Sequence, residues 1–350
     1  MGNIIKRMEP LTRPWVTNDP FLFCGRVINE YPASDGDQGV RDADLGGRPL
    51  GSDFSGAGGF NMYHGERVPG FPAHPHRGFE TVTIVPSGVV DHADSLGATA
   101  RYGDGDVQWL TAGKGVMHAE MFPLRDTDGP NPLDLYQIWL NLPAKDKMVE
   151  PDFVMLWDGA IPRHVTRGDD GATATVKVIA GAYRPVEGGD VLTPPAATPN
   201  SWASNPEAEL AIWQVTLDPG ARLTLPAAQR HEAQRTLFFE RGEEMDVEGQ
   251  RVPVDSRIEV VADQPLRLRN TGATPVAFTV LQAVPIDEPV VRHGPFVMNS
   301  QAEIAQAMRD FQDTQFGGWP WREGGPVHPV ETTRFAKYPG RKDIDLPPPS

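Results

Sequence analysis

The segment GFPAHPHRGFETVT, residues 70–83, carries two histidines separated by one residue, and the segment GKGVMHAEM, residues 113–121, carries a histidine and a glutamate at the same separation. On a β-strand, residues i and i+2 point to the same face. Two such pairs that face each other across a barrel would direct three imidazoles and one carboxylate toward one point. Transition metals accept this set of nitrogen and oxygen ligands. The four predicted metal ligands are His74, His76, His118 and Glu120.

Glycine and proline are abundant throughout the chain, with 36 and 35 residues, and they separate many short apolar runs. This pattern predicts an all-β protein with tight turns. Apolar and polar residues alternate clearly in residues 81–85 and 266–269, as in half-buried strands. The predicted strands are Glu80–Val85, Val107–Leu110, Leu135–Leu140, Thr173–Ile179, Leu210–Leu217, Thr236–Glu240, Ile258–Val261, Leu266–Arg269 and Val276–Leu281.

The length of 350 residues suits two domains. A polar stretch rich in glycine and proline, residues 183–206, predicts a connection between two β-domains in tandem. Residues 34–59 lack periodicity and are predicted to form a long loop. The predicted organisation is an N-terminal metal-binding domain over residues 1–183, a second domain over residues 184–318 that contains one helix, and an extended tail over residues 319–350.

The single convincing helix is predicted over residues 300–313. Ser300 and Glu303 have the spacing of a capping box, in which the serine hydroxyl accepts from the glutamate amide and the glutamate side chain reaches back. Ile304, Met308 and Phe311 follow on one face at helical spacing, so we expect that face to pack against the protein.

The charge balance argues against several classes of function. Lysine and arginine total 32 against 47 acidic residues, which gives a formal net charge of −15 without a basic cluster that would attract nucleic acid. The single cysteine, Cys24, excludes an internal disulfide and fits a reducing compartment. Neither a secretory signal nor an apolar span of membrane length is recognisable. We therefore expect a cytoplasmic protein without direct binding to nucleic acid or membranes.

The identity of the metal is not fixed by the predicted ligands. Zinc, iron, copper, nickel and manganese all accept imidazole with carboxylate, and Fe(II) is the leading interpretation. No thiolate is close in sequence to close off a structural zinc site, so positions stay open for substrate, oxygen or water. The alternative is a cluster of histidines that satisfy one another by hydrogen bonds.

Residues 70–83 resemble the first cupin motif in the form used by the pirin family, and residues 91–121 resemble the second. Residues 137–143 and 294–317 are similar to two further elements of that family. The resemblance implies two cupin barrels with iron in the N-terminal one, bound by the same four residues. It also implies that Glu80, the glutamate of a general cupin motif, has a supporting or structural role.

Three other residues lie close to these motifs in the sequence. Arg77 could orient an anion or could form a salt bridge at the rim of the barrel, while Gln137 and Trp139 are expected to pack rather than react. The second domain departs from a working cupin motif because residues 220–242 contain only His231 and no paired histidine. We expect no metal there. The histidines without a partner at ligand spacing are His92, His164, His293 and His328.

The resemblance implies a metal-dependent dioxygenase, of the type that opens flavonols such as quercetin with O₂. Glu120 would accept the hydroxyl proton of a small aromatic substrate as a general base beside the metal. Apolar residues could line the site for a flat ligand or could simply form the core, and these are Phe71, Phe79, Met117 and Met121.

Two other functions fit the same residues. Members of the family are also thought to act as non-enzymatic, iron-binding redox sensors that regulate a protein partner, since a change of charge at the iron alters the nearby surface. The third interpretation is an inert bicupin whose metal is purely structural.

Overall fold

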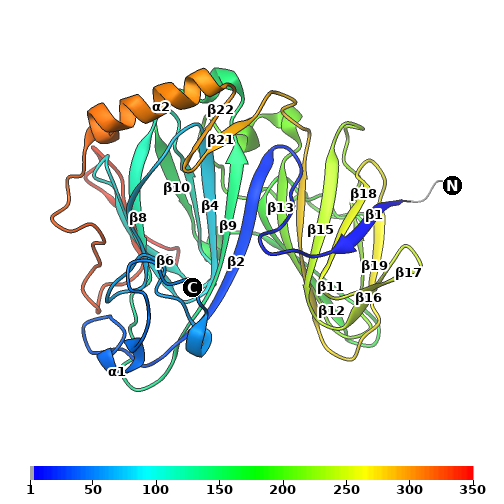
Figure 1. The fold of residues 1–350 in the computed structure, drawn as a ribbon. Coiled ribbons are helices and arrows are strands. Elements are labelled where there is room, and N and C mark those ends of the chain that lie inside the picture. The colour runs from blue at the N-terminus through cyan, green and yellow to red at the C-terminus, as the bar shows by residue number, and fades with distance from the viewer. Residues whose placement is uncertain (1–3, 350) are drawn as a thin grey trace. The chain divides into compact units, whose positions relative to one another are not determined.

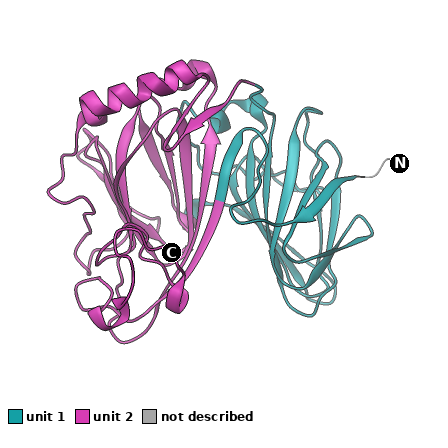
Figure 2. Cartoon of the chain, viewed as in Figure 1, with its two compact units in different colours: residues 1–24, 159–287 teal, residues 25–158, 288–350 magenta. Residues whose placement is uncertain are grey.

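The computed structural model describes residues 4–349, and β-strands dominate it, which confirms the all-β prediction (Figure 1). The chain forms two compact units, and each combines segments that are far apart in the sequence (Figure 2). We call the unit made of Gly25–Asp158 and the described residues from Glu288 onward the N-terminal barrel. The C-terminal barrel consists of the described residues through Cys24 together with Gly159–Asp287.

Two antiparallel sheets build the N-terminal barrel. The five-stranded sheet has the order β10 (Asp152–Leu156), β7 (Val107–Thr111), β4 (Phe79–Ser87), β9 (Asn131–Asn141) and β2 (Phe21–Tyr31). The six-stranded sheet has the order β24 (Ile344–Asp345), β23 (Phe335–Lys337), β6 (Thr99–Gly103), β5 (Val89–Asp94), β8 (Val116–Met121) and β3 (Gly70–His76). A hairpin of β21 (Val291–His293) and β22 (Phe296–Met298) and the helix α2 (Gln301–Thr314) complete the unit.

The C-terminal barrel has the same two-sheet construction. Its seven-stranded sheet has the order β1 (Ile5–Pro10), β18 (Ser256–Val261), β15 (Gln234–Arg241), β20 (Val276–Ala283), β13 (Ala211–Leu217), β12 (Thr173–Ala180) and β11 (Arg163–Arg167). Its four-stranded sheet has the order β14 (Arg222–Leu225), β19 (Leu266–Asn270), β16 (Glu244–Val247) and β17 (Gln250–Pro253). Alternate residues of these strands, such as Val215, Leu237 and Phe239, form one buried core.

The remaining helices are short. They are α1 (Asp42–Leu45) and the 3₁₀ turns η1 (Ala57–Gly59), η2 (Ala144–Asp146), η3 (Asp158–Ala160), η4 (Trp202–Ser204), η5 (Pro206–Ala208) and η6 (Gln315–Gly317). Within residues 4–349, no helix has both the length and the apolar character needed to cross a membrane.

Every predicted strand overlaps an observed one, and the predicted helix is α2. Its N-terminus is close to the predicted capping box, since Ser300 Oγ accepts from the Glu303 amide at 3.3 Å. The Glu303 carboxylate reaches back to the Asn299 amide at 3.0 Å, one residue earlier than in the standard motif. The region of residues 34–59 is largely irregular, as expected, with α1 and η1 as its short helices.

The two compact units do not coincide with the domain boundaries predicted at residues 183 and 318. Helix α2 and the tail belong to the N-terminal barrel, and β1 belongs to the C-terminal barrel by pairing with β18. The tail is held there because β23 pairs with β6 and because the Arg101 guanidinium donates to the main-chain oxygens of His328 and Pro329. Local sequence patterns report strands but not which distant strand each one pairs with, and this is why the boundaries differ.

Candidate metal centre

Three of the four predicted ligands form one cluster inside the N-terminal barrel. His74 and His76 come from β3, His118 comes from β8, and the two strands place His74 directly opposite His118. One ring nitrogen from each histidine lies within 4.8 Å of the other two. The ring centroids of His74 and His118 are 4.4 Å apart, and His76 lies 4.8 Å from each of them.

A bulge in β3 helps to aim these rings. The register between β3 and β8 shifts between Phe71 and His74, so three steps along β3 correspond to two along β8. Bulges of this kind redirect side chains next to functional sites. His74 Nδ1 lies 2.9 Å from the Pro72 main-chain oxygen, a contact in which this nitrogen donates and Nε2 faces away as a potential ligand.

Glu120, the fourth predicted ligand, lies beside the histidines rather than within the same tight group. It is buried, and its Oε2 is 3.9 Å from Nε2 of His118. Thr83 donates its hydroxyl to Oε1 at 3.0 Å, and the Gln137 amide donates to Oε2 at 3.2 Å. These two donors fix the orientation of the carboxylate.

The protonation of the cluster suits metal binding. Burial lowers the pKa of His74 to about 4 and holds the pKa values of His76 and His118 well below the usual value of 6.5. The three rings are therefore neutral at pH 7. Both ring nitrogens of His118 and Nδ1 of His76 are buried without a hydrogen-bond partner in the described structure. Unpartnered buried nitrogens are costly, and a metal ion would satisfy them, so these residues fit a metal.

Glu120 is affected in the opposite direction. Burial raises the pKa of its carboxyl group above the ordinary value, while His92, Thr83 and Gln137 counteract part of this effect. A raised pKa makes the carboxylate a stronger proton acceptor. The cluster thus combines neutral nitrogen ligands with one group that can take up a proton.

His92 is a neighbour of the cluster that the sequence patterns did not indicate. It has no partner at ligand spacing, yet its ring centroid is 5.6 Å from that of His118. It is fully buried on β5, which pairs with β8 so that His92 faces Glu120 in the register. Its Nε2 is 3.4 Å from Oδ2 of Asp94. Ligand spacing alone could not reveal this contact because it depends on the pairing of β5 with β8.

The other residues named from the sequence have structural partners. Glu80 Oε1 accepts from Trp109 Nε1 at 3.1 Å and from Thr111 Oγ1 at 2.7 Å, so it supports the sheet rather than joining the cluster. Arg77 forms the rim salt bridge that we considered, with Nη1 at 2.6 Å from Oδ2 of Asp310 on α2.

Gln137 and Trp139 differ from each other in their roles. Gln137 was expected only to pack, yet its amide donates to Glu120. Trp139 packs as expected, with its ring centroid 5.6 Å from His76 and 4.5 Å from Phe79. In the C-terminal barrel, the His231 side chain is 82% exposed beside Glu232.

These two β-barrels, with a cluster of buried histidines inside one of them, define the class of protein as a bicupin. The sequence profile of the Pirin family matches residues 50–140, and that of the Pirin C-terminal cupin domain matches residues 212–317. The chain is 38% identical over 75% of its length to a proposed quercetin 2,3-dioxygenase of Pseudomonas aeruginosa and covers 84% of that protein. It is 33% identical over 74% of its length to human pirin and covers 81% of that protein. The chain belongs to the pirin family.

A solved structure supports the fold. A quercetin 2,3-dioxygenase from Acinetobacter baumannii superposes with a TM-score of 0.66 at 24% identity, over 90% of this chain and 98% of that chain. At this level of identity the likeness shows that the two-barrel arrangement is shared.

Proposed function

We propose that this protein is a metal-dependent dioxygenase that opens the ring of a flavonol such as quercetin with O₂, and that Fe(II) is its metal. The observation that carries the proposal is the group of three neutral imidazoles, with His76 and His118 buried and His74 half-buried, and a buried carboxylate beside it. The names of the relatives from Pseudomonas aeruginosa and Acinetobacter baumannii, which refer to quercetin 2,3-dioxygenase, support the choice of reaction.

His74, His76 and His118 would hold the metal, with Glu120 as the fourth ligand. A bound divalent metal supplies Lewis acidity to the oxygen atoms of the substrate. Zinc, copper, nickel and manganese accept the same ligands, so the choice of Fe(II) over them belongs to this proposal.

The proposed catalytic residue is Glu120. Its carboxylate would accept the proton of the flavonol 3-hydroxyl, because a carboxylate beside the metal is placed to act as a general base. Thr83 and Gln137 would hold the carboxylate in position through their hydrogen bonds to its two oxygens. These residues thus supply the base and its orientation.

One aromatic residue beside the histidines is placed to contact a flat substrate. The half-buried Phe71 ring lies 6.1 Å from His74 in an edge contact. Aromatic side chains recognise other rings through such offset and edge contacts. Phe79 makes a similar contact with His76 at 5.0 Å, but it is fully buried and therefore belongs to the core.

The test is turnover by protein loaded separately with each of the five metals. We expect O₂-dependent loss of quercetin absorbance, accompanied by O₂ uptake, to be highest with Fe(II). Glu120→Gln should reduce kcat by about 100-fold or more, as expected for loss of a general base. The matched control is Glu80→Gln, which alters a buried glutamate of the same barrel outside the cluster and should retain activity.

Failure to turn over a panel of flavonols with any of these metals, in protein shown to contain the metal, would refute the enzymatic proposal. The non-enzymatic iron-binding regulator would then be the function to pursue, with a search for its protein partner.

A further inference from the structure

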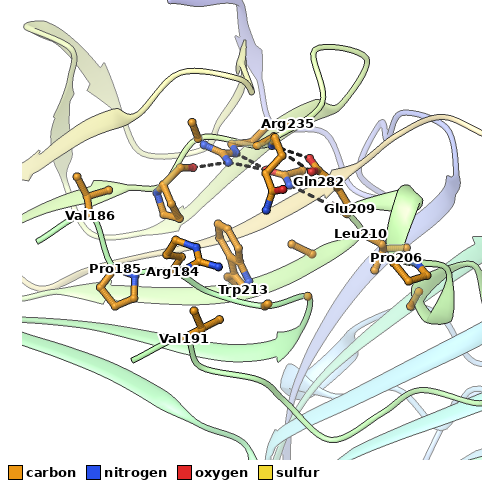
Figure 3. A pocket seen from close by; sticks show the side chains of 18 of the residues that line it. Arg184, Pro185, Val186, Val191, Pro206, Glu209, Leu210, Trp213, Arg235 and Gln282 are labelled. Carbon is orange, nitrogen blue, oxygen red and sulfur yellow. Dashed lines mark hydrogen bonds between the residues drawn. The ribbon is translucent and has the colours of Figure 1, made fainter. Parts of the chain in front are cut away.

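The C-terminal barrel contains a cavity of about 690 Å³ (Figure 3). This volume is typical of pockets that bind small organic molecules. Three charged residues line the cavity, the cations Arg184 and Arg235 and the anion Glu209, so the lining has an excess of positive charge. Much of the rest is apolar, including Val191 and Leu210.

Arg235 is the central polar group of this cavity. It lies on β15 on the same side as Leu237 and Phe239, whose side chains are in the core, so its guanidinium points into the barrel. The residue is only 2% exposed. Its Nε and Nη2 donate to Gln282 Oε1 at 2.8 and 2.5 Å, and Nη2 also donates to the Pro226 oxygen at 2.7 Å. All of these acceptors are neutral.

The guanidinium still has an unsatisfied donor. Among residues 4–349, Nη1 of Arg235 is buried without a hydrogen-bond partner, and the same is true of Nε1 of Trp213, another residue that lines the cavity. The guanidinium carbon lies 5.7 Å from the centroid of the Trp213 ring. Two unpartnered N–H groups therefore occur together at one cavity.

No carboxylate of the cavity pairs directly with Arg235. Both oxygens of Glu209 are occupied by the main-chain amide of Gln229, and Oε2 also accepts from the amide of Arg230. A buried cation that lacks a bonded anion is costly in a protein interior. Burial lowers the pKa of Arg235 to about 10, so the guanidinium remains charged at neutral pH.

We infer that this cavity is a binding site for a small organic carboxylate with an apolar body. The two oxygens of a carboxylate would accept from Nη1 of Arg235 and Nε1 of Trp213, and the apolar body would lie against Val191 and Leu210. Charge-assisted hydrogen bonds from arginine to a carboxylate are among the strongest in proteins. The inference does not depend on the proposed dioxygenase, since every residue that lines the cavity lies in the C-terminal barrel.

The experiment uses the full-length protein and a pair of probes that differ in charge. Isothermal titration calorimetry measures the binding of 2-naphthoate and of 2-naphthamide, which has nearly the same shape without the negative charge. We expect 2-naphthoate to bind at least about tenfold more tightly than the amide. Protein freed of metal should give the same result as metal-loaded protein.

Three variants assign the binding to this cavity. Arg235→Met should weaken the binding of 2-naphthoate by about tenfold or more. Gln282→Glu provides a carboxylate next to the guanidinium, so it should fold with the arginine satisfied and should also lose the probe. Arg222→Met removes an exposed arginine from β14 of the same barrel and should bind like the wild type.

Several results would overturn the inference. It fails if the wild type does not bind 2-naphthoate at concentrations up to about 1 mM. It fails equally if the amide binds as tightly as the acid, or if folded Gln282→Glu retains full affinity. Should Arg235→Met not fold, the Gln282→Glu variant and the comparison of acid with amide still decide the matter.

Discussion

The two barrels bury different polar chemistry in interiors of similar construction. The histidine cluster of the N-terminal barrel combines imidazoles held neutral by burial with the carboxylate of Glu120 beside them. The cavity of the C-terminal barrel is lined by the guanidinium of Arg235 and the indole of Trp213, each with an N–H group that has no hydrogen-bond partner among the described residues. The cluster offers lone pairs, and the cavity offers protons. Under the two proposals above, the same fold would bind a cation in one unit and an anion in the other.

This difference shows that the barrel does not by itself determine the ligand. The strands supply inward-facing positions at alternate residues, and the residue types at these positions decide what is bound. Residues 231–236 carry an arginine and a single, exposed histidine, and they lack a histidine pair like that on β3 of the N-terminal barrel. Loss of the metal motif therefore need not mean loss of ligand binding.

The strongest test of the comparison is removal of one imidazole from each barrel. We expect His118→Ala to lower the metal content of the purified protein from about one ion per chain to about one tenth of that, because the remaining ligands hold a metal far less tightly. His231→Ala, which removes the exposed histidine of the C-terminal barrel, should leave metal content unchanged. Elemental analysis of both variants provides the measurement.

If the two variants lost metal equally, or if neither lost any, the prediction that metal binds only in the N-terminal barrel would be wrong. Thermal melting with and without chelator shows whether His118→Ala is folded. A folded variant that keeps its metal would mean that the ion does not need this imidazole.

Acid should destabilise the metal-free N-terminal barrel selectively. The pKa values of His74, His76 and His118 are lower in the folded state than in the unfolded chain, so the unfolded chain binds more protons as the pH falls below about 6.5. Each histidine then costs about 1.4 kcal/mol of unfolding free energy per pH unit, until its folded pKa is reached. The raised pKa of Glu120 acts in the opposite direction, but it is one group against three.

Hydrogen exchange of metal-free protein at pH 7.5 and pH 5.5 provides the measurement. Peptides from β3 and β8 should lose protection at the lower pH more than peptides from β15 and β20, after correction for intrinsic exchange rates. Arg235 does not titrate in this interval because the pKa of its side chain is about 10. Uniform loss of protection in both barrels would contradict the prediction.

The local parts of the metal centre could be predicted from the sequence, because the spacing of two residues and the extended backbone together determine the face of a side chain. This is why His74, His76 and His118 meet as expected. The contact of His92 with His118 and the hydrogen bond from Gln137 to Glu120 could not be predicted in this way. They depend on which strands are neighbours, and that information is not contained in any one segment.

For the same reason, the sequence could not predict that the N-terminal segment belongs to the C-terminal barrel and the C-terminal segment to the N-terminal barrel. The sequence patterns did not predict a strand at β1, and its pairing with β18 is what assigns it to the C-terminal barrel. The cavity around Arg235 likewise depends on β15, β13 and β20 lying side by side in one sheet. A lone arginine on an apolar strand gave no signal of a binding site.

Two buried arginines test the assignment of the terminal segments to the barrels. Arg77 of the N-terminal barrel pairs with Asp310 on α2, and Arg257 of the C-terminal barrel pairs with Glu9 on β1 at 3.2 Å. We expect Arg77→Met and Arg257→Met each to cost about 1–3 kcal/mol, since each removes the hydrogen bonds and ion pairs of a buried guanidinium.

Hydrogen exchange distinguishes the two variants. Arg77→Met should loosen α2 without affecting β1, and Arg257→Met should do the reverse. If Arg77→Met exposed the strands of the C-terminal barrel instead, the domain boundary predicted from the sequence would be the better description of the chain.

The smallest expected effect concerns the orientation of Glu120. The Gln137 amide donates to this carboxylate and thereby lowers its pKa, so Gln137→Leu should raise the pKa of Glu120. If Glu120 is the base, the acidic limb of the plot of kcat/KM against pH should move to higher pH. The matched change in the other barrel is Gln282→Leu, which removes a neutral partner of Arg235 and should leave this limb in place. If active Gln137→Leu protein kept the pH profile of the wild type, the base that titrates in this profile would be a group other than Glu120. This conclusion would hold even if the histidines still bound the metal.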